Sequence, residues 1–209
     1  MSRHLNLWKH NLGAVPEEVW DDEELETLVL ADNGLTAISE KLGRLTKLRM
    51  LDLGHNKLAA VPDAIGNLVV LDFLYLHNNE LTAVPDTLRN LHRLRYLNVS
   101  ENRLTSLPLV VSLIELRATD NEIAALPEEI GQLVQLRELH LRNNALTTLP
   151  ESVGCLQSLR QIDLRGNPLA TLPRSLLDLP RLEKVDVRWV NIDDEVLDRL
   201  EGRGCLVYR

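Results

Sequence analysis

The chain of 209 residues has few aromatic side chains, few cysteines and no long apolar run. Aromatic residues make up 3% of it, so an interior built from this sequence must rely on aliphatic side chains. The two cysteines, Cys155 and Cys205, form neither a metal-spaced cluster nor a disulfide framework, and both are expected to serve packing. No run of 18 apolar residues exists, and the residues after Met1 lack the apolar core of a signal peptide. We therefore expect no membrane insertion and a cytoplasmic location.

A surplus of positive charge is also missing, since the formal net charge is −8. Binding to nucleic acid through bulk electrostatics needs a basic domain with clustered cations, so we expect no nucleic-acid partner, although a local basic patch stays open. Hydrophobic residues make up 44% of the chain, which excludes an intrinsically disordered protein.

What the sequence does have is a repeat with the frame L-x-x-L-x-L-x-x-N-x-L-x-x-L-P. It starts at residues 25, 48, 71, 94, 113, 136 and 159, with a period of 23 and one exception of 19. The fourth and sixth positions of each unit are apolar, which predicts a short strand with one buried face. The ninth position is always asparagine, whose amide can bond the backbone of neighbouring turns: Asn33, Asn56, Asn79, Asn102, Asn121, Asn144 and Asn167.

The second half of most units begins with proline followed by acidic residues, then by an apolar residue and often glycine. Proline and carboxylates favour the first turn of a helix, so we expect a short helical turn on the return segment. One such unit cannot bury its leucines alone, whereas stacked units can. We divide the chain as a single domain, 1–209, with a degenerate leading unit (1–24), seven regular repeats (25–181) and a C-terminal capping unit (182–209). In the last unit Asp193 and Asp194 are expected to cap a helix, and residues 205–208 to add a closing strand.

In these features the chain resembles the leucine-rich repeat proteins over essentially its whole length. The 23-residue unit ending Val61-Pro62-Asp63-Ala64-Ile65-Gly66-Asn67-Leu68 is similar to the intracellular Ras-suppressor-type class. The resemblance implies an α/β fold, a right-handed horseshoe solenoid with a parallel sheet on its concave face and short helical or irregular segments on its convex face. It also implies no enzymatic activity, no cofactor and a protein partner bound on the concave sheet, as in signalling scaffolds.

The residues between the buried leucines should point out of the concave face and form columns down the units. Neighbouring strands lie roughly 4.8 Å apart, so Met50, Phe73, Tyr75 and Tyr96 are expected to form one exposed apolar patch, with His77 beside it. Exposed patches rich in Tyr, Trp, Met and Arg are typical of interaction sites. The alternative is aromatic packing across strands that only stiffens the sheet.

A basic strip is expected toward the C-terminal half of the same face. Its members are Arg117, His140, Arg142, Arg165 and Arg188. Two interpretations stay open: docking of an acidic segment through arginines, or a salt-bridge network with Glu138, Asp163 and Asp186 worth roughly 0 to 1 kcal/mol per pair.

Catalytic and metal-binding patterns are weak. His55 and His77 fall in adjacent units, but the carboxylate or thiol spacing of a metal site is missing, so we expect no metal. No nucleophile, base and orienting group fall into a catalytic arrangement, so we expect no enzyme. The 19-residue unit lacks four residues of the return segment after Pro108. Either neighbouring segments close over this place, or a notch flanked by Leu109 and Val110 stays open.

We therefore expect a protein-interaction module or signalling scaffold that binds a protein on its concave face. The alternatives are a structural or self-assembling repeat protein, or a secreted bacterial effector that acts by binding proteins. We expect a monomer, with a homodimer as the alternative.

Overall fold

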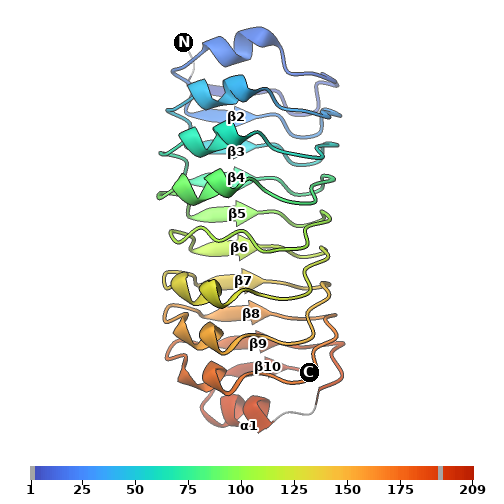
Figure 1. The fold of residues 1–209 in the computed structure, drawn as a ribbon, viewed down its shortest axis with the longest axis vertical. Helices are drawn as coiled ribbons and strands as arrows, with labels where there is room; N and C mark the ends of the chain where they lie inside the picture. The colour runs from blue at the N-terminus through green and yellow to red at the C-terminus, as the bar shows by residue number, and fades with distance from the viewer. Residues whose placement is uncertain (1–2, 193–194) are drawn as a thin grey trace.

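The computed structural model describes residues 3–192 and 195–209, and its main element is one ten-stranded parallel sheet. The strands follow one another in chain order, stacked along the long axis of the molecule (Figure 1). Their bounds are β1 His4–Asn6, β2 Thr27–Val29, β3 Met50–Asp52, β4 Phe73–Tyr75, β5 Tyr96–Asn98, β6 Glu115–Arg117, β7 Glu138–His140, β8 Gln161–Asp163, β9 Lys184–Asp186 and β10 Leu206–Tyr208. The predicted α/β repeat solenoid is confirmed.

Neighbouring strands pair without any slip in register. Leu28 lies opposite Leu51, Leu51 opposite Leu74, and Leu97 opposite Leu116, so register is kept even across the short unit. The register holds because a slip by one residue would turn each buried leucine to the solvent.

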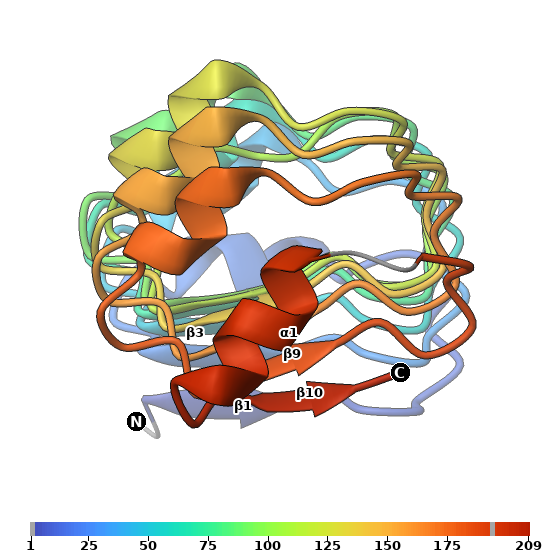
Figure 2. The ribbon, with the colours of Figure 1, turned by 90° about the horizontal axis from the view of Figure 1, so that it is seen from below.

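The return segments lie across the core from the sheet and carry short 3-10 helices (Figure 2). Each begins directly after a proline, or after Ser39 in one unit, and the proline φ angles of −57° to −72° suit a helix start. The bounds are η1 Glu17–Asp21, η2 Glu40–Arg44, η3 Asp63–Asn67, η4 Asp86–Asn90, η5 Glu128–Gln132, η6 Glu151–Cys155 and η7 Arg174–Asp178. The predicted helical turns are confirmed in all units but the short one.

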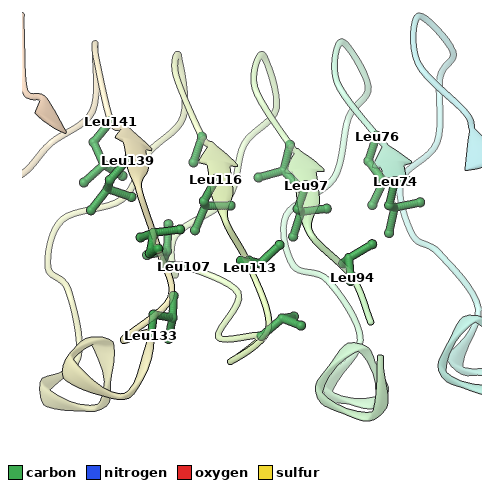
Figure 3. Packing of buried hydrophobic residues seen from close by; sticks show 14 of the residues in the cluster. Leu74, Leu76, Leu94, Leu97, Leu107, Leu113, Leu116, Leu133, Leu139 and Leu141 are labelled. Carbon is green, nitrogen blue, oxygen red and sulfur yellow. The ribbon is translucent and has the colours of Figure 1, made fainter. Parts of the chain in front are cut away.

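Stacked layers of leucine between the sheet and the return segments form a single core (Figure 3). The side chains of Leu74, Leu97 and Leu116 are fully buried, and each lies next to its counterparts in the neighbouring units. The buried asparagine column closes the turns after the strands. The Nδ2 group of Asn79 donates to the carbonyl oxygens of Leu53 at 3.0 Å and Leu76 at 3.1 Å, and its Oδ1 accepts the Leu58 N–H.

The C-terminal end of the core is covered by the only α-helix of the described chain. Helix α1 (Glu195–Gly202) buries Val196, Leu197 and Leu200, and β10 follows as the predicted closing strand. The expected cap at Asp193 and Asp194 lies outside the described residues. None of the described helices has the length and apolar character needed to cross a bilayer.

The short unit lacks a 3-10 helix, which leaves a break in the outer layer between η4 and η5 (Figure 1). The Leu113 N–H donates to Val110 O just as the Leu136 N–H donates to Leu133 O, so Val110 holds the place of a core leucine. The single residue Leu109 therefore takes the place of the five residues that form the 3-10 turn in other units. Of the two alternatives for this place, closure by neighbouring segments is wrong, and the open alternative is right for Leu109 but not for Val110, which is only 1% exposed. The place is open as a groove of about 460 Å³ that Leu109 and Val111 help to line.

Candidate functional site

The face of the sheet turned away from the core, here called the open face, is formed by the outer residues of each strand. The middle residue of each inner strand is buried, whereas the residues on either side of it are half-buried or exposed on most strands. Strand register therefore decides which side chains meet on this face.

The register brings the predicted apolar patch together. Met50 lies opposite Phe73, which lies opposite Tyr96, and Tyr75 stands on the same strand as Phe73. The Tyr75 and Tyr96 rings are 5.0 Å apart between centroids. Phe73 is 42% exposed, although it is one of the most apolar side chains of the protein. We call Met50, Phe73, Tyr75 and Tyr96 the aromatic patch.

Both tyrosines of the patch are held in the neutral form. Burial raises the pKa of Tyr75, and the negative charges of Asp52 and Glu115 raise it further. Burial likewise raises the pKa of Tyr96 and outweighs the opposing charge of Arg117. The patch therefore offers two uncharged hydroxyl groups on top of apolar ring surface.

His77 extends the patch toward the next turn. Its ring meets the ring of Tyr75 at 6.3 Å and that of His55 edge-on at 4.7 Å. The His77 ring fits here because residue 54 is glycine. A Cβ on Gly54 would come within 2.4 Å of the ring. Burial and the neighbouring His55 lower the pKa of His77, so its ring is neutral. His77 Nδ1 is enclosed and has no hydrogen-bond partner among the described residues.

Each basic side chain of the predicted strip faces a carboxylate. Arg117 pairs with Glu115 at 2.5 Å, His140 with Glu138 at 3.2 Å, Arg142 with Asp120 at 3.3 Å, Arg165 with Asp163 at 2.5 Å and Arg188 with Asp186 at 2.8 Å. Three of these acids, Glu138, Asp163 and Asp186, are the partners that the sequence predicts. Glu115 and Asp120 are the partners that it misses.

A groove runs along the basic strip and reaches His77 beside the aromatic patch. It has a volume of about 400 Å³, and its lining includes His77, Arg117, His140, Arg142 and Arg165. Five of the ten predicted site residues line the groove: His77, Arg117, His140, Arg142 and Arg165. Tyr75 of the aromatic patch contacts one of them, His77. The groove walls carry charges of both signs, because Glu101, Asp120 and Asp163 also line the groove.

A family model described as leucine rich repeat matches residues 3–58, 23–81, 46–104 and 111–169. The chain belongs to the leucine-rich repeat family. Residues 105–110, which lie between two of these matches, fall in the short unit, where the return segment departs from the repeat.

Several solved repeat structures are similar. The ectodomain of the Arabidopsis thaliana receptor kinase GASSHO1/SCHENGEN3, in complex with CASPARIAN STRIP INTEGRITY FACTOR 2, has 30% identity and a TM-score of 0.82 over 93% of this chain and 25% of that one. A plant peptide hormone receptor, RGFR1 in complex with RGF2, has 27% identity and a TM-score of 0.76 over 87% and 30%. An internalin from Listeria monocytogenes, at 21% identity and a TM-score of 0.82 over 94% and 58%, shares the fold. This chain thus spans only a part of each, and no curated protein matches it significantly.

The last repeats also carry an aromatic group that is not among the site residues predicted from the sequence. At the last repeats Trp189 is 72% exposed, and the guanidinium groups of Arg165 and Arg188 lie 5.8 and 5.9 Å from its ring centroid. The Lys184 ammonium and the Arg188 guanidinium lie 5.2 and 5.5 Å from the ring centroid of Tyr208 in β10. Tyr208 could have been found from the sequence by continuing the outward columns into the closing strand, because that places Tyr208 beside Asp186.

One group of side chains in the described repeats has the composition of a metal site. Glu115, Glu138 and His140 place one ligand atom each within 4.8 Å of one another. Arg117 already pairs with Glu115, and His140 with Glu138, so these ligand atoms have protein partners. Cys205 packs in the core as expected, but the prediction for Cys155 is wrong, since it is exposed.

Proposed function

We propose that this leucine-rich repeat chain is a non-enzymatic interaction module that binds a protein or peptide partner on the open, concave face of its sheet. The observation that carries the proposal is the aromatic patch. Outer strand positions tolerate any polar residue, yet three adjacent strands place Met50, Phe73, Tyr75 and Tyr96 there, and Phe73 stays 42% exposed.

The patch has the properties of a binding hot spot. Aromatic side chains give large contact areas, and a few such residues usually carry most of the energy of an interface. The rigid sheet and the contact between Tyr75 and Tyr96 hold the rings in place before binding, so little ordering entropy is lost. The plant receptors similar to this chain are in complex with a peptide hormone or an integrity factor, which supports a peptide or protein as the ligand class.

In this proposal the basic strip orients the partner. Its basic side chains already have carboxylate partners, so an acidic segment must compete with carboxylates such as Asp163 and Asp186. We therefore assign Arg117, His140, Arg142, Arg165 and Arg188 to the polar rim of the interface, where charges govern the association rate and its salt dependence more than the affinity.

The proposal includes a scaffold role in a reducing cytoplasm and membership of the Ras-suppressor-type class. The 23-residue period supports the class. The free thiols of Cys155 and Cys205 support the compartment, since such thiols persist where glutathione keeps them reduced. The division into a leading unit (1–24), seven repeats (25–181) and a capping unit (182–209) stays a prediction.

The test is a selection of peptides from a random displayed library on the immobilised protein, followed by titration of the enriched peptides. We expect the triple variant Phe73→Ala, Tyr75→Ala and Tyr96→Ala to lose at least about 2 kcal/mol of binding free energy, or about 30-fold in affinity. Its thermal unfolding midpoint should stay close to that of the wild type, because these side chains lie outside the core.

The matched control truncates Val69 and Val134, exposed aliphatic residues of the return segments, and should leave peptide affinity unchanged. Peptides that bind the triple variant as tightly as the wild type would place the site elsewhere. A large loss of stability with unchanged binding would make the patch a packing feature of the sheet.

A further inference from the structure

The groove of the short unit lies on the return side of the solenoid, across the core from the open face. It opens where the outer layer is broken between η4 and η5 (Figure 1). Its volume of about 460 Å³ falls in the range of ligand pockets, roughly 300 to 1,000 Å³. All of its lining comes from residues 84–132, well inside the chain. The groove therefore has room for a few residues of a ligand.

Aliphatic side chains and prolines make up much of this lining. Leu109 and Val111 belong to the short unit itself, and Val84 and Pro127 come from the units on either side. Leu109 is half-buried, and Val111 is 45% exposed. An apolar side chain placed here removes its own surface and theirs from water, which favours binding.

The acidic residue that starts a 3-10 turn can bond the backbone of the turn packed behind it. The Glu40 carboxylate of η2 accepts the Ala64 N–H of η3 at 3.2 Å, and the Glu151 carboxylate of η6 accepts the Ser175 N–H of η7 at 3.1 Å. Asp86 holds the same position in η4, but the short unit has no turn to offer it an N–H group. The Asp86 carboxylate therefore lines the groove as an acceptor without a donor among the described residues.

Two further charged side chains line the groove, Arg89 of η4 and Glu129 of η5. Arg89 follows Asp86 by three residues, which is one turn of a 3-10 helix, so both lie on the same side of η4. In contrast to the basic strip, none of these three side chains has an ion pair in the part of the chain that the structure describes. The groove thus offers a ligand two carboxylates and one guanidinium, a negative balance.

The side chains of the walls exclude a helical turn as the occupant. Where two turns pack together, the contact is between glycine and a small residue: a Cβ on Gly154 would lie only 2.5 Å from the Ser175 Cβ. In the groove, the position of the glycine is held by Arg89 and that of the serine by Glu129. A helical turn would have to displace both long side chains, whereas a thinner, extended segment fits between them.

We propose that this groove binds an extended segment of a protein partner in which a lysine or arginine stands next to an aliphatic residue. The aliphatic side chain packs on Leu109 and Val111, and the basic side chain meets the carboxylates of Asp86 and Glu129. Backbone N–H groups of the segment donate to Asp86, and the Arg89 guanidinium donates to its carbonyl oxygens. Because the groove lies across the core from the open face, this binding goes beyond the proposed function and both sites can be occupied together.

Selection of peptides from a displayed random library on the triple variant Phe73→Ala, Tyr75→Ala and Tyr96→Ala tests the proposal, because this bait lacks the aromatic patch. We expect the enriched peptides to carry a basic residue next to an aliphatic one and to bind the wild type equally well. Asp86→Lys with Glu129→Lys should weaken their binding at least about 10-fold, since like charges then meet. Added salt should also weaken it.

The matched control is Asp63→Lys with Glu122→Lys, which makes the same change of charge at exposed carboxylates outside the groove. It should bind the enriched peptides like the wild type. Peptides in which glutamate replaces the basic residue should bind the Asp86→Lys, Glu129→Lys variant more tightly than they bind the wild type. Thermal unfolding confirms that each variant is folded.

Three outcomes overturn the proposal. The first is a selection that enriches no peptide with the basic and aliphatic pair, and the second is equal affinity of such peptides for both charge-reversal variants. The third is a dimer of the wild type in sedimentation velocity that Asp86→Lys with Glu129→Lys abolishes, since a second copy of the chain is then the occupant. None of these outcomes depends on binding to the open face, so the two proposals fail separately.

Discussion

Asp186 is the one charged residue that is fully buried in the described part of the chain, with a side chain only 2% exposed. Arg188 reaches it at 2.8 Å and Arg165 at 3.5 Å. Burial disfavours its charge, but the hydrogen bonds from Arg188 and the charges of Arg165 and Arg188 outweigh burial, and the pKa of Asp186 is lowered. The Asp186 carboxylate therefore contacts two arginines of the basic strip, Arg165 and Arg188.

The first prediction concerns the acid sensitivity of this group. A carboxyl group with a lowered pKa in the folded state stabilises the fold above its ordinary pKa of about 4, and that contribution disappears as the pH falls through the folded-state value. Asp186→Asn should lower the free energy of unfolding at pH 7 by about 1 to 3 kcal/mol. In denaturant titrations between pH 7 and pH 3, the free energy of unfolding of this variant should fall less steeply with falling pH than that of the wild type.

The control for this experiment is Asp63→Asn, because Asp63 is exposed at the start of η3. It should leave the stability at pH 7 within about 0.5 kcal/mol of the wild type. Equal losses at both positions, or an unchanged acid limb in Asp186→Asn, would show that Asp186 contributes no special stability.

At the scale of the element, the fourth residue of each 3-10 turn depends on the segment packed behind that turn. Gly43, Gly66, Gly131 and Gly154 hold this position in η2, η3, η5 and η6, each of which has another 3-10 turn packed behind it. A Cβ on Gly66 would lie 2.6 Å from the Thr87 Cβ and 2.7 Å from the Thr87 carbonyl oxygen. In η4, which faces the groove of the short unit, the position is held by the exposed Arg89.

The second prediction rests on this contrast. Gly66→Ala should lower the free energy of unfolding by about 1 to 3 kcal/mol, because the methyl group forces η3 and η4 apart. Arg89→Ala at the equivalent position should change it by less than about 0.5 kcal/mol, since no turn packs behind it there. Chemical denaturation measures both. An unchanged free energy of unfolding in Gly66→Ala would show that η3 and η4 can move apart without an energetic cost.

The elements themselves could be predicted from the sequence because each is encoded within one unit. Alternation around Leu74 and Leu97 gives the strands, and the proline before each acidic residue gives the turn starts. Features that depend on the next unit could not be predicted. The burial of Val110 depends on which residues are lost from a repeat, and the exposure of Cys155 depends on how η6 lies against its neighbours. The aromatic patch follows from strand register alone. The partner of Arg142, Asp120, lies one unit away, whereas Glu115, the partner of Arg117, lies two residues away on the same strand and could have been named from the sequence.

At the scale of the whole molecule, the sheet is continuous from β1 to β10 but the outer layer is not. Adjacent turns contact each other from η1 to η4 and from η5 to η7, and the short unit separates the two groups. In a repeat protein each unit is stabilised mainly by its nearest neighbours, so the missing turn weakens the coupling between the two halves. Both sides of the break carry long charged residues, Arg89 on η4 and Glu129 on η5, where the packed junctions carry glycine and small residues.

The last prediction restores the missing turn. Replacing Leu109 by the five residues Glu-Glu-Ile-Gly-Gln of η5, together with Arg89→Gly and Glu129→Ser, should raise the free energy of unfolding by about 1 to 2 kcal/mol. The denaturant m-value should rise as well, because the added turn buries new surface. The same insertion without the two substitutions should gain less, since Arg89 and Glu129 occupy the space that the turn needs. Equal stability of the two designs would show that these charged residues do not keep the groove open, and that its width is set by chain length alone.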